Sequence, residues 1–432
     1  MKMIGKEILA KYPKYKASGE EWLGKIPEGW ELIRFKYLFN EINERSEDGL
    51  GDLLSVSQYT GVTRKSDKLE GGEILTTAST LEGYKKVYKN DLVSNIMLAW
   101  NGSLGFSPFN GITSPAYSVY RLNSGNSERY FHYLVRSQIY KSEFKRCSSG
   151  IIESRLRLYT DDFYNIRSLV PPLPEQTAIA NFLDQKTAQI DKAIEQKEKL
   201  IELLNERKQI VIQKAVTKGL DSKSKMKESG VEWIGDIPEH WKVKRLKYLV
   251  RIIKRIIGFE GPDVLSITQK GIKVKDIKSG EGQLAQDYSN YQILNKGEFA
   301  MNHMDLLTGY VDISKFDGVV SPDYRVFVPF SNEIQHDYLL RLFQYGYKSK
   351  TFYRYGQGVS KLGRWRFPAH NFNNFFMPIP PAEEQKKIGI YLNEMEIKID
   401  QTVASQKDQI DRLKEYRSVL IDNAVTGKLK VN

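Results

Sequence analysis

The amino-acid sequence contains the same unit twice, and this duplication restricts the folds that the chain can adopt. The segment Ser18–Trp30 recurs as Ser229–Trp241, 211 residues later. Three shorter matches follow in the same order: Lys36–Leu38 with Lys247–Leu249, Ser114–Tyr117 with Ser321–Tyr324, and Pro171–Gln176 with Pro380–Gln385. Because the matches are collinear and their offsets differ by only a few residues, they indicate a tandem duplication with short changes in loop length. We expect two structurally equivalent halves.

Each half combines a globular part with a charged helical part. In the globular parts, short runs rich in β-branched and aromatic residues alternate with Gly, Asn and Asp turn signals, which predicts strands. The predicted strands are Leu53–Tyr59, Lys89–Met97 and Ala116–Leu122, then Val264–Gln269, Gly297–Met304 and Tyr324–Val328. The predicted globular domains are 1–170, with an N-terminal arm at 1–17, and 221–379, and the helical segments are 171–220 and 380–432.

Apolar residues recur at alternating spacings of four and three along both helical segments. Seven of ten positions are apolar in each segment, and the three polar positions coincide when the segments are aligned. A stripe with a period of ~3.5 residues that continues this long predicts a coiled-coil seam, and each helix is the natural partner of the other. The predicted seam residues are Leu183, Ile190, Ile194, Ile201, Leu204 and Val211, with Leu392, Ile399, Val403, Ile410, Leu413 and Leu420.

The direction of the two helices follows from the order of the chain. The first helical segment connects the two globular domains, so we expect one domain at each of its ends. If a pseudo-twofold axis relates the halves, the second helix runs back and the pair is antiparallel. From Leu183 to Ala215 it spans roughly 48 Å, more than one DNA turn of ~34–36 Å. The predicted fold is α+β, with two tandem pseudo-symmetric mixed domains separated by an antiparallel coiled coil of two long helices.

The composition favours a cytoplasmic protein with an anionic partner. The chain has 432 residues, 41% of them hydrophobic, and a formal net charge of +12. Residues 20–170 are neutral and residues 229–379 carry +6, so charge alone does not establish nucleic-acid binding. No apolar run approaches the ~18 residues of a membrane span, and no secretory signal is visible. The single cysteine, Cys147, excludes an internal disulfide and a multi-thiolate zinc site.

Motifs for catalysis are weak. The segment Thr426–Leu429 lacks the upstream Gly and the following Ser or Thr of a phosphate-binding loop, and Gly280–Ala285 is better explained as a turn. The five histidines lack metal-ligand spacing, so no metal site is expected. Asp263, Asp276 and Lys278 formally match a metal-dependent nuclease pattern, which arises often by chance and is not repeated in the first half. A restriction enzyme with its own nuclease at these residues is the enzymatic alternative.

A basic segment rich in aromatic residues is a better candidate for function. Seven Lys or Arg side chains and no acidic one lie between residues 341 and 367, interleaved with Phe, Tyr and Trp. The equivalent residues 140–159 hold five basic and two acidic side chains. Such residues can neutralise phosphates or reach base edges in DNA. The alternative is a solvated basic helix and loop that packs on the core through its aromatic residues.

The two halves differ most in the middle of their globular parts. Residues 58–65 and 99–103 of the first half have no close counterpart in residues 269–273 and 304–309. A common scaffold with different loops suits two readers of different short sequences. The candidate DNA-binding residues are Gln58, Thr60, Arg64, Lys65, Asn101, Ser103, Lys145, Arg146, Ser148, Arg155 and Arg157, with Gln269, Lys270, Lys273, Asn302, His303, Arg354, Gln357, Lys361, Arg364 and Arg366.

Three motif pairs make the whole chain similar to the specificity subunits of type I restriction-modification systems. Each half opens with Gly-x-x-Trp-x-Gly-x-Ile-Pro-x-x-Trp, and a Pro-Pro-x-x-Glu-Gln-like motif starts each helical segment. Each helical segment ends in an Ala-Val-Thr motif that contains a Gly. The segments are Gly19–Trp30 and Gly230–Trp241, Pro171–Gln176 and Pro380–Gln385, and Ala215–Leu220 and Ala424–Leu429, the last with Gly and Lys exchanged.

The resemblance implies a DNA-binding subunit without a catalytic centre. In that family each globular domain is a target-recognition domain for one half of a split DNA site, and the helices set the gap. The implied partners are double-stranded DNA, two methyltransferase subunits and two restriction subunits. S-adenosylmethionine, ATP and Mg²⁺ are then expected on the partners, and no cofactor on this chain. A coiled-coil adaptor that does not bind DNA stays open as a third interpretation.

Overall fold

The computed structural model describes residues 10–68, 80–152, 156–277, 285–358 and 365–431. The chain divides into two compact units, one formed by two stretches of the sequence and the other by one. The first unit contains Met1–Lys197 together with Lys407–Asn432, and the second contains Glu198–Gln406. Each unit therefore includes part of both long helices.

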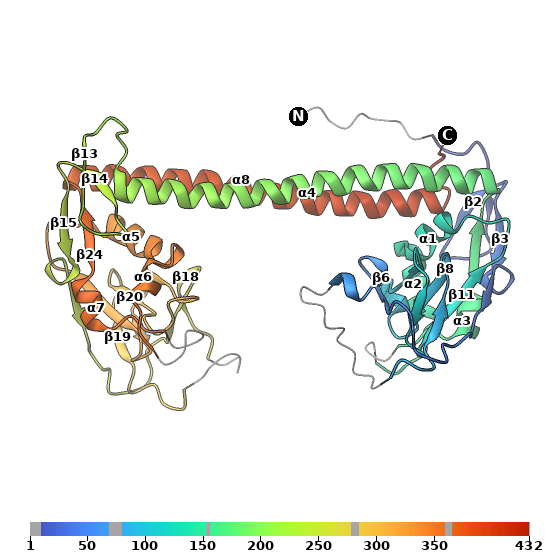
Figure 1. Cartoon of the computed structure of the whole chain (residues 1–432), viewed down its shortest axis with the longest axis horizontal. Helices are drawn as coiled ribbons and strands as arrows, with labels where there is room; N and C mark the ends of the chain where they lie inside the picture. The colour runs from blue at the N-terminus through green and yellow to red at the C-terminus, as the bar shows by residue number, and fades with distance from the viewer. Residues whose placement is uncertain (1–9, 69–79, 153–155, 278–284, 359–364, 432) are drawn as a thin grey trace. The chain divides into compact units, whose positions relative to one another are not determined.

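A four-stranded antiparallel sheet forms the centre of the first unit (Figure 1). Its order is β4 (Phe39–Glu41), β11 (Tyr117–Leu122), β8 (Asp91–Asn95), β9 (Leu104–Phe106). Four two-stranded ladders surround it: β1 (Tyr15–Ala17) with β2 (Lys25–Pro27), β3 (Glu31–Arg34) with β12 (Arg167–Val170), β5 (Leu54–Ser57) with β6 (Gly61–Arg64), and β7 (Lys85–Val87) with β10 (Gly111–Thr113).

The second unit repeats this topology strand by strand. Its four-stranded sheet has the order β16 (Val250–Ile253), β23 (Arg325–Pro329), β20 (Phe299–Met301), β21 (Val311–Ile313). The ladders are β13 (Met226–Glu228) with β14 (Asp236–Pro238), β15 (Lys242–Arg245) with β24 (Phe376–Ile379), β17 (Leu265–Thr268) with β18 (Gly271–Val274), and β19 (Gln292–Leu294) with β22 (Gly318–Val320). The repeat seen in the sequence is therefore a repeat of structure, and each of the six strands predicted above overlaps an observed one.

Short helices and a long one complete each unit. The short helices are α1 (Glu128–Arg136), α2 (Gln138–Cys147) and α3 (Thr160–Asn165) in the first unit, and α5 (His336–Lys348), α6 (Thr351–Arg354) and α7 (Ala369–Asn374) in the second. Residues of all six contribute to the cores of their units, and aromatic residues lie at the centre of each core. Phe35 and Phe163 stack at 4.6 Å in the first unit, and Phe343 and Phe372 stack at 5.8 Å in the second.

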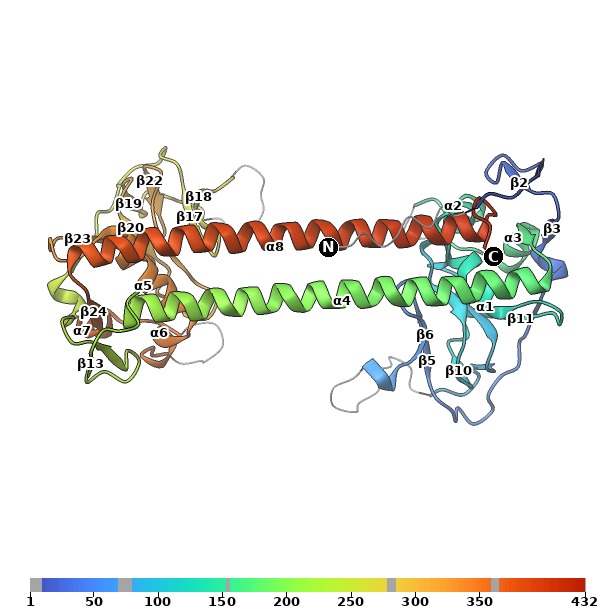
Figure 2. The same ribbon diagram turned by 90° about the horizontal axis from the view of Figure 1, so that it is seen from above.

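The long helices are α4 (Leu173–Lys218) and α8 (Ala382–Val425), and they lie side by side (Figure 2). In the first unit the start of α4 packs against the end of α8, since Leu183 and Leu420 belong to one core. In the second unit the end of α4 packs against the start of α8, where Ile212 and Leu392 share a core. The helices form an antiparallel coiled coil, as the sequence predicts. All twelve predicted seam residues are buried or half-buried.

The glutamine of each Pro-Pro motif ties the start of a long helix to the short helix that packs on it. Gln176 donates to the carbonyl of Pro171 at 2.9 Å and accepts from the amide of Ser127, the N-cap of α1, at 2.8 Å. Gln385 makes the equivalent bonds, to Pro380 at 2.8 Å and from the amide of Gln335, the N-cap of α5, at 2.8 Å. Both glutamines are fully buried or nearly so. The recurring motif is a structural joint.

The Ile-Pro-x-x-Trp motif of each half packs against the glycine that ends a long helix. Trp30 and Trp241 are 1% and 0% exposed. Gly427, after α8, has a φ of +70°, and a Cβ there would lie 3.2 Å from the ring of Trp30. Gly219, after α4, has a φ of +74° and the same 3.2 Å approach to Trp241. Only glycine adopts this left-handed conformation without strain, so it ends each helix and admits the indole.

Candidate nucleic-acid interface

The turn of one hairpin differs in length between the two units. In the first unit Ser57 pairs with Gly61 across the turn, which leaves three residues, Gln58–Thr60, in the loop. In the second unit Thr268 pairs with Gly271, which leaves only Gln269 and Lys270. The hairpins themselves are equivalent, since each consists of two four-residue strands at the same place in the topology. The scaffold is shared and the turn is not.

Most candidate residues of the first unit lie at the surface, and several are held by neighbours. Thr60 is exposed and Gln58 half-buried. Arg64 lies 2.7 Å from Asp52 and stacks over the ring of Phe109 at 4.3 Å, and Lys65 and Asn101 are half-buried. Lys145 is exposed and lies over the ring of Trp100 at 5.3 Å. Arg146 is exposed and makes a bidentate pair with Glu143 at 2.6 and 2.7 Å.

Two serines among the candidates serve the fold. Ser103 is 4% exposed, so its hydroxyl does not reach the surface. The hydroxyl of Ser148 donates to the carbonyl of Phe144 at 2.7 Å at the end of α2. Arg157 is exposed, and its backbone pairs with Ser149 in a short bridge that closes the loop between them. Arg155 lies outside the described residues.

The second unit holds its candidate loops differently. The amide of Gln269 donates to the carbonyl of Thr308 at 3.3 Å, so the hairpin turn is tied to the neighbouring loop by its own side chain. Lys270 and Lys273 are exposed on the same hairpin. Gln357 and Arg366, both exposed, pair through their backbones in a bridge equivalent to Ser149 with Arg157. Arg354 is exposed and lies 3.6 Å from Glu232, while Lys361 and Arg364 lie outside the described residues.

Asn302 and His303 directly follow β20 and are half-buried. The side chain of Asn302 accepts from the amide of Met304 at 3.3 Å, and Asn95 accepts from Met97 at 3.2 Å in the same way. The sequence did not single out Asn95, because the residues around it differ. Burial and, to a smaller extent, the nearby Arg325 and Arg366 together lower the pKa of His303 to about 3. His303 is therefore neutral at physiological pH and adds no charge to the surface.

Five aromatic residues of the basic segment 341–367 belong to the core of the second unit. Phe343, Phe352 and Phe367 are 0–1% exposed, and Tyr345 and Tyr347 are 7% and 5% exposed. These buried rings cannot stack on bases. For this part of the segment the second interpretation holds, in which the aromatic residues pack on the core and the basic residues face solvent. The reason is helical spacing, which directs aromatic residues inward while the cations between them lie at the surface.

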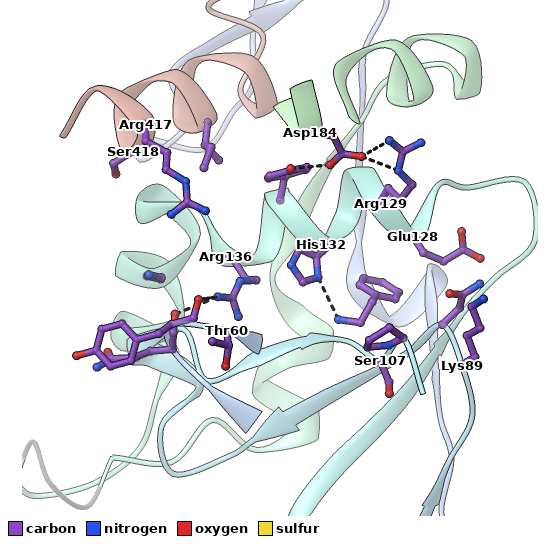
Figure 3. Close-up of a pocket in the computed structure, with 18 of the residues that line it drawn as sticks. Thr60, Lys89, Ser107, Glu128, Arg129, His132, Arg136, Asp184, Arg417 and Ser418 are labelled. Carbon is purple, nitrogen blue, oxygen red and sulfur yellow. Dashed lines mark hydrogen bonds and ion pairs between the residues drawn. The ribbon is translucent and has the colours of Figure 1, made fainter. Parts of the chain in front are cut away.

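A cleft of about 740 Å³ lies beside the hairpin turn of the first unit (Figure 3). Six Lys or Arg side chains line it, against two acidic ones: Lys89, Arg129, Arg136, Lys141, Lys414 and Arg417, with Glu128 and Asp184. Asp184 accepts from Arg129 at 3.0 Å and from the hydroxyl of Tyr133 at 2.6 Å. The remaining cations give the cleft a basic character that the sequence analysis missed, because its residues come from six separate parts of the chain.

The structure describes only two of the three residues of the alternative nuclease pattern. Asp263 and Asp276 are exposed and flank the β17–β18 hairpin, and Lys278 lies outside the described residues. Among the described residues, no group of three His, Cys, Asp or Glu side chains is placed to hold a metal ion. No helix in the described ranges is long and apolar enough to cross a membrane.

Comparison with protein families decides the classification. The model of the type I restriction modification DNA specificity domain matches the chain twice, at residues 27–203 and 238–412. The chain belongs to this family. The two matches fall in the two halves of the duplication, so the specificity domain is the repeated unit.

Curated relatives match most of the length of this specificity protein. The type I restriction enzyme MjaVIII specificity subunit of Methanocaldococcus jannaschii is 24% identical over 94% of each chain. The type I restriction enzyme EcoKI specificity subunit of Escherichia coli is 21% identical over 73% of this chain and 67% of its own.

Solved structures share the fold of this specificity protein. A chain from a study of complex assembly and conformational transition of the type I R-M system has a TM-score of 0.67 at 14% identity and covers 94% of this chain and 99% of its own. The HsdS subunit from Thermoanaerobacter tengcongensis has a TM-score of 0.54 at 16% identity, covering 94% and 98%. At these identities the likeness concerns the fold alone.

Proposed function

We propose that this specificity protein is the non-catalytic DNA-recognition subunit of a type I restriction-modification complex. Each globular unit reads one half of a split site in double-stranded DNA. The helix pair sets the gap between the halves and binds two methyltransferase and two restriction subunits. S-adenosylmethionine, ATP and Mg²⁺ belong to those partners.

One observation carries this proposal: the two units have the same fold but differ in the length of an equivalent turn. A three-residue turn at Gln58–Thr60 and a two-residue turn at Gln269–Lys270 follow equivalent strands. Exposed loops on a common rigid scaffold are suited to reading different short sequences. Exposed cations near both turns favour a polyanionic partner: Lys89 lines the same cleft as Gln58–Thr60, and Lys273 lies on β18.

The continuity of the long helices supports the role as a spacer. Helix α4 is unbroken from Leu173 to Lys218, and its first part packs in one unit while its last part packs in the other. A helix rises ~1.5 Å per residue and resists compression, so its length fixes a separation along DNA. Polar side chains on both helices stay available for partner subunits, since the seam uses only one face.

Salt-dependent binding tests the DNA-reading role. The chain is purified with the methyltransferase subunit of its system, and its affinity for duplexes from the host genome is measured between about 50 and 200 mM salt. Phosphate contacts predict that log K falls linearly with log salt, by roughly 0.9 per phosphate neutralised. An adaptor that does not bind DNA predicts no retention of the duplex at any salt concentration, and that result would overturn the proposal.

A further inference from the structure

A half-buried arginine joins the two divergent loops of the first unit. Arg136 ends α1 and lies near Thr60 of the hairpin turn (Figure 3). Its guanidinium donates to five backbone carbonyls. The acceptors are Leu104 at 2.8 Å, Gln58 at 3.0 Å, Tyr59 at 3.2 Å, and Ser57 and Gly102 at 3.4 Å. The hairpin contributes Gln58 and Tyr59 from its turn and Ser57 from the end of β5, and the other two acceptors are Gly102 and the first residue of β9, Leu104. One side chain therefore fixes both loops to each other and to α1.

Two glycines leave the space that this guanidinium occupies. A Cβ at Gly61 would lie 3.2 Å from Nη1 of Arg136, and one at Gly105 would lie 3.6 Å from it. Gly61 also has a φ of +69°. Within the described part of the chain, the guanidinium donates to carbonyl oxygens and to no carboxylate. Burial and the nearby Arg417 lower the pKa of Arg136 from its ordinary value, but an arginine stays charged there.

The second unit has a different residue at the equivalent position. Tyr130 and Tyr338 are equivalent, because each hydroxyl donates to the last turns of one long helix and to the strand that precedes the other. Tyr130 contacts the end of α8 and β12, and Tyr338 contacts the end of α4 and β24. Six residues further on, Arg136 corresponds to Gln344, which accepts from Arg341 at 3.3 Å.

The charge of the side chain that contacts the hairpin turn is also opposite in the two units. Gly105 pairs with Val93 as Asp312 pairs with Ala300, so Gly105 and Asp312 are equivalent. The carboxylate of Asp312 accepts from the amide of Ile272 at 3.1 Å, beside Gly271. The turn of the first unit is therefore held by the positively charged Arg136, which donates to carbonyl oxygens. The turn of the second unit is held by the negatively charged Asp312, which accepts from an amide.

We infer that Arg136 is the positioning residue that sets the geometry of both reading loops of the first unit, and with it the base specificity of one half-site. The inference rests on the proposed function. Its physical basis is the planar fork of the guanidinium, which offers five donors in fixed directions. A lysine keeps the charge but concentrates it on one nitrogen, and a glutamine keeps only two donors.

Three variants separate positioning from charge and from folding. Arg136→Gln introduces the residue of the second unit, Arg136→Lys keeps the charge, and Gln344→Ala is the matched control at the equivalent site. Each is made in the full chain and assembled with its methyltransferase subunit. Hydrogen exchange is measured first, because it reports on the loops without DNA. We expect residues 57–61 and 102–104 to exchange about tenfold faster or more in both Arg136 variants, while β11 and the second unit are unchanged.

Base discrimination is measured next, on duplexes that carry the motif found by modification mapping, with one half-site altered at a time. Both Arg136 variants should lose about tenfold of discrimination at one half-site and none at the other, and Gln344→Ala should alter neither. If Arg136→Lys restored discrimination fully, only the positive charge of Arg136 would matter, and the geometry of its guanidinium would not. If hydrogen exchange of the two loops were unchanged in the variants, Arg136 would not position them. If the wild-type complex has no split site, the proposed function itself fails, and loop exchange still tests Arg136.

Discussion

The hydroxyl of Tyr130 donates to the carbonyl of Val425 at 3.3 Å, in the last turn of α8. Its counterpart Tyr338 donates to the carbonyl of Val216 at 3.1 Å, near the end of α4. Both tyrosines are 0% exposed, and burial raises the pKa of both well above its ordinary value. In each unit, one buried tyrosine hydroxyl therefore joins the globular part to the long helix that ends there. The two tyrosines occupy equivalent positions.

Removing this hydroxyl should destabilise one unit at a time. Tyr130→Phe and Tyr338→Phe keep the ring but leave two carbonyls without their tyrosine donor, so each should lower the free energy of unfolding by about 1–2 kcal/mol. Chemical denaturation followed by near-ultraviolet circular dichroism measures the loss, and the exposed Tyr59→Phe is the control. A variant as stable as the wild type would show that the joint depends on packing alone.

The duplication made much of this fold predictable. Offsets of 207 to 211 residues aligned the strands of one half with those of the other, and the four-three spacing identified both long helices and their seam. These signals are periodic or repeated, so they survive without knowledge of tertiary contacts. The motif residues Gln176 and Trp30 were recognised as markers, but their role as buried joints needed the structure.

The candidate site was less predictable, because exposure and long-range contacts leave little trace in local sequence. Arg136 lies about 75 residues from the turn that it holds, and nothing in α1 distinguishes it from Arg129. The aromatic residues between 341 and 367 matched the composition of a stacking surface, yet packing placed five of them in the core. Ser103 was chosen for its polarity and is buried. The choice of individual DNA-contacting residues stays a prediction.

Acid should destabilise the second unit through His303. The folded pKa of His303 is about 3, whereas an unfolded histidine titrates near its ordinary value of about 6.5. The unfolded state therefore binds more protons between these values, and stability is lost as the pH falls from about 6.5 toward 3. Denaturation curves at pH 7.5, 6.5 and 5.5 should show a smaller loss for His303→Asn than for the wild type. Equal losses would contradict the prediction, and the exposed His370→Asn should behave as the wild type.

Two equivalent arginines should affect different halves of the target. Arg366→Ala should weaken binding at the second unit's half-site, and Arg157→Ala, at the equivalent bridge, should weaken it at the first unit's half-site. Removing an arginine that reads a base costs about 1–3 kcal/mol of binding free energy. Competition between duplexes altered in one half-site measures the difference. Equal weakening for all duplexes would assign these residues to the phosphate backbone.

Lengthening the coiled coil should widen the gap between half-sites. Inserting one heptad into α4 and one into α8 at facing positions keeps the seam in phase and adds ~10.5 Å, about three base pairs at ~3.4 Å each. Sequencing of modified bases should show both half-sites unchanged and farther apart. A changed half-site would count against the spacer role, and insertion into one helix alone should abolish modification because the seam then loses its register.

Mapping of modified bases in a host that expresses this chain with its methyltransferase subunit tests the central claim most directly. Two units with the same fold and different loops predict a methylated motif of two unlike short sequences, separated by a fixed number of unspecified base pairs. One continuous recognition sequence, or two identical halves, would contradict the account.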